Sequence, residues 1–122
     1  MKSIFEQSDL HGLSVRNRLV RSATWEGIAQ ADGGIQQNTY AIYERLAKGG
    51  VSTIITGFTS VDLHDRYFGG MMCLCDDALI PQYKKLVDIV HEQDTKIFAQ
   101  LALGAYYRPW KMEDMCRSNP IT

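Results

Sequence analysis

The chain has 122 residues and a formal net charge of −1, from 13 lysine and arginine residues against 14 aspartate and glutamate residues. Its 45% hydrophobic and 22% charged residues are typical of one soluble globular domain at most. Because the sequence has no basic run and no apolar stretch near the roughly 20 residues of a spanning helix, we expect neither a nucleic-acid partner nor a membrane partner.

Residues 13–20 have apolar side chains around a polar centre. They predict a hairpin arm, near His11 and Gly12, that runs into a first strand. The following residues 29–37 are rich in glycine, glutamine and aspartate and have no apolar period. They predict a surface loop, and a long loop after a first strand is often functional.

A helix and a buried strand are expected next. Asn38 is a plausible N-cap, and the apolar stripe of the helix stops at Gly49 and Gly50. The β-branched run Val51–Thr56 then predicts a buried strand. The residues that form the stripe are Tyr40, Tyr43, Leu46 and Ala47.

A second helix and a third strand complete the pattern. Asp76 and Asp77 can cap the helix, and Pro81 suits its first turn. The segment Lys96–Ala102 predicts the third strand. The expected buried stripe of the second helix is Ile80, Tyr83, Val87 and Val90.

The alternation of strands and helices predicts an α/β fold with three parallel strands and two intervening helices. Three parallel strands leave two sheet edges with unpaired backbone groups, which proteins usually cover or close. The chain is therefore either a small open α/β unit or part of a larger fold.

Candidate binding residues stand where the strands end, because ligands of parallel α/β folds gather at the carboxyl ends of strands. Ser22, Ala23 and Thr24 follow the first strand, Gly57 follows the second, and Gln100 lies among apolar residues of the third. We expect these three groups to be adjacent in space.

Each of these residues also has a purely structural interpretation. Gln100 is either a satisfied core amide or a group that recognises a planar heterocycle carrying a carbonyl and a ring nitrogen. Gly57 suits a tight turn or the close approach of a flat ligand. Ser22 and Thr24 can satisfy backbone groups of their own loop.

The cysteines and the N-terminus indicate a reducing compartment. Cys73 and Cys75 are separated by one residue, too close for an ordinary disulfide between extended neighbours, and Cys116 leaves an odd count. Cysteine and histidine spacings do not favour a metal site. The N-terminus lacks the apolar core of a signal peptide, so we expect a cytoplasmic protein.

Over about residues 5–105 the sequence resembles the old yellow enzyme family of FMN-dependent NAD(P)H:flavin oxidoreductases. The resemblance is carried by several motifs in the order that the family has. These motifs are LSVRNRLV (13–20), YERLAKGG (43–50), IITGFTSV (54–61), RYFGG (66–70), CDDALI (75–80) and KIFAQL (96–101).

The resemblance implies the N-terminal part of a (β/α)8 TIM barrel. Residues 1–16 would form the hairpin arm, residues 17–105 the first three βα strands, and residues 106–122 a truncated loop. A complete barrel has eight strands and about 250 residues or more, so only a part of it is expected here.

By the same resemblance, the parent reaction is hydride transfer from NAD(P)H to FMN and on to an activated alkene or a similar small-molecule acceptor. Ser22, Ala23 and Thr24 would contact the flavin ring, while Gly57 and Gln100 would meet its pyrimidine edge. Ala23 stands where many members have proline, and Thr24 and Trp25 stand where many have methionine followed by cysteine or threonine.

Two functions remain open from the sequence. The first is an N-terminal segment of such an oxidoreductase, which we expect to be inactive alone. The alternative is a non-catalytic fragment or interaction module that associates through its open sheet edges, for example as a homo-oligomer.

Overall fold

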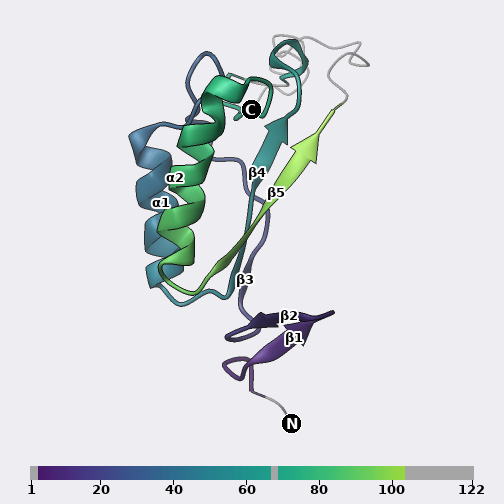
Figure 1. The fold of residues 1–122 in the computed structure, drawn as a ribbon, viewed down its shortest axis with the longest axis vertical. Helices are drawn as coiled ribbons and strands as arrows, with labels where there is room; N and C mark the ends of the chain where they lie inside the picture. Colours follow the sequence, from purple (N-terminus) through teal and green to yellow (C-terminus); the bar gives the residue numbers. More distant parts are fainter. Residues whose placement is uncertain (1–2, 67–68, 104–122) are drawn as a thin grey trace, which may run out of the picture.

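The computed structural model describes residues 3–66 and 69–103, which form a short hairpin and an α/β layer (Figure 1). Strands β1 (Ser8–Leu10) and β2 (Leu13–Val15) pair in an antiparallel hairpin. The second sheet is parallel and has the order β3 (Val20–Arg21), β4 (Thr53–Ser60) and β5 (Lys96–Ala102).

Helices α1 (Gln37–Lys48) and α2 (Ile80–His91) lie together on one side of this parallel sheet (Figure 1). Two 3₁₀ turns, η1 (Leu63–Asp65) and η2 (Asp77–Leu79), follow β4. Within the described residues, neither helix is both long and apolar enough to cross a membrane. The prediction of a hairpin, three parallel strands and two helices is confirmed, whereas the truncated loop at 106–122 lies outside the described residues.

The hairpin turns where the sequence predicted it. His11 and Gly12 both have positive φ, 51° and 91°, and they join the paired residues Leu10 and Leu13. Two residues of positive φ match the twist of the flanking strands. The Asp9 carboxylate also accepts the Gly12 N–H at 2.8 Å, which fixes the turn.

Helix α1 begins earlier than Asn38, so the predicted N-cap is wrong. The cap position is Gln36, whose carbonyl accepts the Thr39 N–H at 3.0 Å and closes the first turn with Asn38 already inside it. The predicted C-terminus is confirmed, because the helix ends at Lys48 and the Gly49 N–H donates to the Arg45 carbonyl at 2.9 Å.

The core lies between the two helices and the parallel sheet. Tyr43, Ala47, Ile54, Leu86 and Val90 are each at most 1% exposed. Burial of these side chains supplies the main free energy that holds the helices on the sheet.

The buried stripe of α2 differs from the predicted one. Ile80 is 57% exposed and Val87 is only partly buried, whereas Leu79 and Leu86 are buried. The cause is η2, whose cap Asp76 accepts the Ala78 N–H at 2.8 Å. This extra turn directs Leu79 inward ahead of the helix.

Strand β4 extends beyond the predicted Val51–Thr56 and contains a β-bulge. Its pairing with β5 moves from Ile55 opposite Phe98 to Phe58 opposite Gln100, which leaves one extra residue on β4. The Thr56 hydroxyl accepts the Gln100 N–H at 3.1 Å and takes the place of a backbone carbonyl. Strand β5 has the predicted bounds.

Loop 29–37 is partly buried rather than a surface loop. Gly33, Gly34 and Ile35 are buried, and the Gly33 carbonyl accepts the Cys73 N–H at 3.0 Å. Gly33 has a φ of 85°, and a Cβ there would overlap Cys73.

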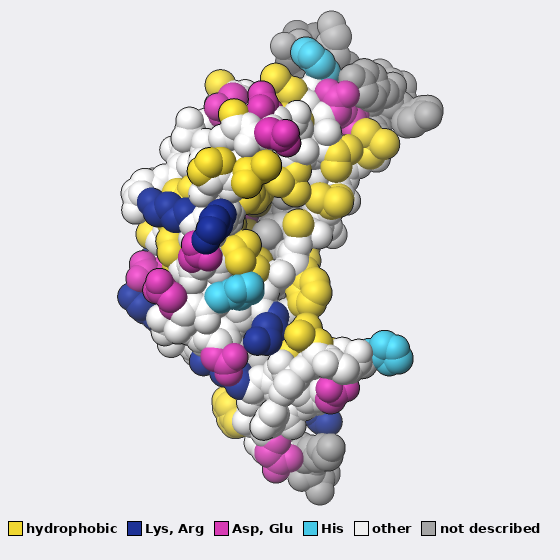
Figure 2. All heavy atoms as spheres, viewed as in Figure 1, with side chains coloured by type: hydrophobic (Ala, Val, Ile, Leu, Met, Phe, Trp, Pro, Cys, Tyr) yellow, Lys and Arg dark blue, Asp and Glu magenta, His cyan; other side chains and the backbone are white. Residues whose placement is uncertain are grey.

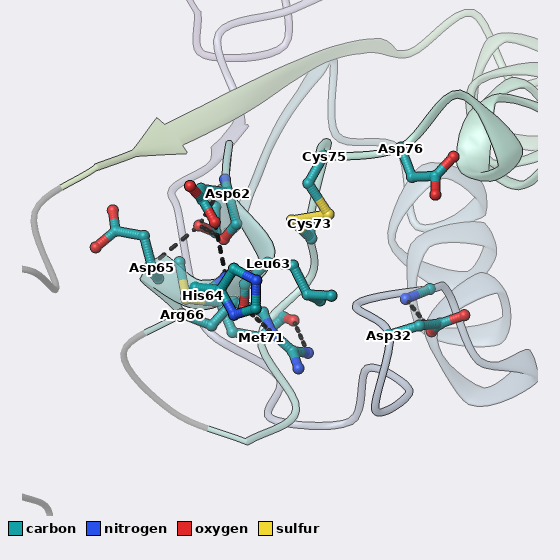
Figure 3. The surroundings of a disulfide bond; sticks show 12 residues. Asp32, Asp62, Leu63, His64, Asp65, Arg66, Met71, Cys73, Cys75 and Asp76 are labelled. Atoms are coloured by element: carbon teal, nitrogen blue, oxygen red, sulfur yellow. Dashed lines mark hydrogen bonds between the residues drawn. A yellow bond between two sulfur atoms is a disulfide. The ribbon is translucent and has the colours of Figure 1, made fainter.

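The expectation of reduced Cys73 and Cys75 is wrong in this structure, because the two form a disulfide (Figure 3). The segment turns at Leu74, whose N–H donates to the Ser60 carbonyl at 2.8 Å, and the two Cα atoms lie 5.4 Å apart. This separation lies within the range that disulfides span, whereas the prediction assumed extended neighbours.

Arg16 joins the hairpin to the amino ends of the parallel strands. Its Nη2 lies 2.9 Å from the carbonyl oxygens of Ala47 and Val51 and 3.0 Å from the Thr95 hydroxyl. The guanidinium thus connects the end of α1 with the segments that enter β4 and β5.

We expect Arg16→Met to lower the free energy of unfolding by about 2 kcal/mol, because three acceptors lose a charged donor. Urea denaturation of the 122-residue chain measures this change. Arg45→Met, at an exposed position of α1, is the control. Equal effects of the two substitutions would contradict the role assigned to Arg16.

We expect Cys73 and Cys75 to resist alkylation in the folded chain until a reductant is added. Peptide mass spectrometry after iodoacetamide treatment measures this protection. Labelling of both residues after unfolding in denaturant without reductant would contradict the disulfide.

Candidate functional site

The carboxyl ends of β3, β4 and β5 lie at one edge of the sheet, as their parallel pairing requires. A Cβ added to Gly57 would lie 2.7 Å from the carbonyl oxygen of Thr24. Gln100 pairs with Phe58, the residue after Gly57. The structure therefore brings together the three groups of residues that the sequence predicted to be adjacent.

These predicted residues differ in exposure. Ser22, Thr24 and Gln100 are exposed, Ala23 is half-buried, and Gly57 is buried. Gln100 is exposed near the end of β5. The interpretation of its side chain as a satisfied core amide is therefore wrong. An exposed amide and exposed hydroxyls at the same edge of the sheet offer both donors and acceptors to a ligand.

Gly57 is covered by the segment that follows β3. Its missing side chain faces Thr24 and Glu26, since a Cβ there would also lie 2.9 Å from the Glu26 Oε2. Its N–H donates to the Tyr43 hydroxyl at 3.3 Å, and its carbonyl accepts from the hydroxyls of Thr56 and Thr59 at 2.9 and 3.0 Å. Glycine at this position lets the two segments pack closely.

A polar network links these segments. The Arg21 guanidinium lies 3.8 Å from the Glu26 carboxylate, donates to the Ser22 carbonyl at 3.0 Å and donates to the Thr24 hydroxyl. The Glu26 carboxylate and the Tyr43 hydroxyl also interact, and each affects the pKa of the other. Charge-assisted hydrogen bonds of this kind are about twice as strong as neutral ones.

The candidate binding residues predicted from the sequence do not include Arg21, Glu26 or Tyr43. Arg21 and Glu26 flank the predicted loop 22–24, and their opposite charges were a usable signal. Tyr43 was assigned to the core stripe, where its buried hydroxyl still needs a partner.

Burial sets the protonation of this network. Desolvation raises the pKa of Glu26 above its ordinary value of 4.5, although hydrogen bonds and the Arg21 charge act in the opposite direction. Desolvation, together with the Glu26 charge, raises the pKa of Tyr43 as well. Tyr43 therefore stays a neutral hydroxyl at neutral pH.

A small cavity borders the network. Its volume of about 10 Å³ is room for about one water molecule. The Thr39 hydroxyl is buried at its wall and makes no hydrogen bond within the described part of the chain. The other walls include Trp25, Glu26, Gly57, Phe58 and Met72.

A larger hollow of about 150 Å³ lies beside the disulfide, between Asp32, Leu63 and Asp76 (Figure 3). The carboxylates of Asp32 and Asp76 both accept hydrogen bonds from nearby backbone N–H groups. Asp32 accepts the Gly34 N–H at 2.8 Å, and Asp76 caps η2. These contacts explain both aspartates without a ligand.

The model of the NADH:flavin oxidoreductase / NADH oxidase family matches residues 3–119. The chain belongs to this family. It is 33% identical to an NADH-dependent flavin oxidoreductase of Hypocrea jecorina, over 74% of this chain and 23% of the relative. It is 28% identical to a 4,4'-dithiodibutanoate disulfide reductase of Rhodococcus erythropolis, over 81% of this chain and 24% of the relative.

Among solved structures, Old Yellow Enzyme from Pichia sp. AKU4542 superposes with a TM-score of 0.76 and 21% identity. The match covers 82% of this chain and 26% of that structure. The fold of the chain is thus that of part of a TIM barrel. The chain spans about a quarter of the length of these two relatives.

The raised pKa of Glu26 predicts a pH-dependent stability. A carboxyl whose pKa is higher in the folded chain contributes stability that is complete below the unfolded pKa and is lost as pH rises through the folded pKa. We therefore expect the free energy of unfolding of the wild type, relative to Glu26→Gln, to fall as pH rises above about 4.5 and then to level off.

Urea denaturation of both chains over a pH series measures this difference. Glu44→Gln, which removes an exposed carboxylate paired with Lys48, is the control and should leave the decline in place. A wild-type minus Glu26→Gln difference that is constant with pH would contradict the assignment.

Proposed function

We propose that the edge formed by the carboxyl ends of β3, β4 and β5 binds the isoalloxazine ring of FMN in an NAD(P)H-dependent oxidoreductase. Membership of the NADH:flavin oxidoreductase / NADH oxidase family supports FMN and a nicotinamide reductant. The observation that carries the proposal is that Thr24 after β3, Gly57 of β4 and Gln100 of β5 lie at the same carboxyl edge of the sheet, with Thr24 and Gln100 exposed.

The side chains at this edge fit the flavin ring chemically. The pyrimidine part of an isoalloxazine carries carbonyl oxygens and a ring N–H, and the exposed amide of Gln100 can both donate and accept. The exposed Ser22 and Thr24 hydroxyls, in the loop after β3, add further polar groups. The rings of Trp25 and Phe58, 5.8 Å apart, contribute flat apolar surface.

The residues of this chain bind and orient the ring, and the bound FMN supplies the hydride chemistry. Ser22, Ala23 and Thr24 form one side of the proposed site, and Gln100 forms the other. Gly57 brings them together by letting Thr24 pack on β4. The acceptor is a small molecule such as an activated alkene.

The edge of β5 favours a second candidate function, association with another chain. In residues 3–66 and 69–103, β5 pairs only with β4, and Phe98, Leu101 and Leu103 are between 46% and 68% exposed. Figure 2 shows hydrophobic side chains gathered over the upper part of the sheet. Exposed apolar surface of this kind is typical of interaction sites.

For the flavin site, we expect FMN to bind the chain saturably, with a change in flavin fluorescence. Gln100→Ala should weaken this binding by about tenfold, because hydrogen bonds to the ring edge are lost. Gln93→Ala, between α2 and β5 at the opposite end of the sheet, is the matched control. Binding that is absent, or unchanged by Gln100→Ala, would contradict the proposal.

For the second candidate, we expect the chain to sediment as a dimer or larger species at micromolar concentration. Leu101→Lys on β5 should shift it toward monomer, because a charge is unfavourable in an apolar contact. A monomer at all concentrations would contradict association through this edge.

A further inference from the structure

Glu26 is connected with two of the proposed flavin-contacting segments. On one side it pairs with Arg21, which donates to the Ser22 carbonyl and the Thr24 hydroxyl. On the other side its carboxylate lies against Gly57 and interacts with Tyr43, whose hydroxyl oxygen accepts the Gly57 N–H. One carboxylate thus joins the loop after β3 to the bulge of β4.

The Glu26 side chain lies within this contact rather than on the surface. Its exposed fraction is 12%, against 26% for Arg21, and an oxygen of its carboxylate would meet a Cβ at Gly57. An interaction with so little exposure is screened weakly by water and salt. The geometry of Thr24 therefore depends on the charge that Glu26 presents to Arg21.

We propose that Glu26 is a positioning residue for flavin binding, which fixes Thr24 through Arg21 and Gly57 through Tyr43. This inference rests on the proposed flavin site. Glu26 itself is largely buried and acts through its two partners. Among the described residues, the titratable groups that interact with Glu26 are Arg21 from β3 and Tyr43 from α1.

A first test needs no flavin and no substitution. In the wild-type chain labelled with ¹⁵N and ¹³C, we expect the backbone amides of Thr24 and Gly57 to titrate together with the Glu26 carboxyl carbon. Loss of the negative charge weakens the attraction between Glu26 and Arg21. The hydrogen bond from Arg21 to Thr24 and the one from Gly57 to Tyr43 then change. Amides that do not follow the Glu26 titration would overturn the inference, whatever the result with FMN.

Substitutions separate this network from simple folding effects. Glu26→Gln keeps the shape of the side chain and should abolish the shared titration step, while Glu44→Gln should retain it. Tyr43→Phe should shrink the step at Gly57, where the adjacent Glu26 carboxylate still acts directly, and leave the step at Thr24 unchanged. A step at Gly57 of the same size in Tyr43→Phe and in the wild type would overturn the proposed path through the tyrosine.

The second test measures the FMN dissociation constant of the same chains. We expect Glu26→Gln to weaken FMN binding by about tenfold and Glu44→Gln to leave it unchanged. Equal affinity of the wild type and Glu26→Gln would overturn the positioning role. If the wild type binds no FMN, the proposed function fails, and the titration alone decides whether Glu26 holds Thr24 and Gly57.

Discussion

The parallel pairing of β4 with β3 and β5 is the constraint on which the rest of the structure depends. Because the three strands run in the same direction, their amino ends meet at one edge and their carboxyl ends at the other. The helices cover one face of the sheet and leave the loops after the strands to form the second edge (Figure 1). The location of the proposed site follows from this arrangement.

The two edges differ in their chemistry. At the amino edge, the Arg16 Nη2 group joins the carbonyls of Ala47 and Val51, and Asn17 donates to the Gly50 carbonyl at 2.8 Å. At the carboxyl edge, Thr24 and Gln100 remain exposed. There Arg21 pairs with Glu26 and donates to the Ser22 carbonyl. This division matches the general rule that one end of such a fold provides stability and the other binds ligands.

The sequence was a good guide where one local signal dominated. Lys96–Ala102 is mostly apolar, and the two glycines after Lys48 stop α1, so both were predicted at the right residues. The predictions failed where a short turn competes with the pattern. Asn38 and Ile80 were misassigned because a turn closed by Gln36 and the 3₁₀ turn η2 each shift the helix entry.

The sequence predicted the residues of the candidate site but not the contacts that position them. Strand order alone places Thr24, Gly57 and Gln100 at one edge. The contact of Glu26 with Tyr43, by contrast, depends on the path of a loop across a β-bulge, which no local pattern specifies. The Cys73–Cys75 disulfide likewise depends on a turn that is fixed by pairing with β4.

Hydrogen–deuterium exchange of the chain with and without FMN tests the central claim most directly. A flavin site at the carboxyl edge predicts slower exchange together at residues 22–26, 56–58 and 99–101, with no change near Arg16 at the opposite edge. Protection at only one strand end, or at the hollow beside the disulfide instead, would contradict a flavin site built from three adjacent strand ends.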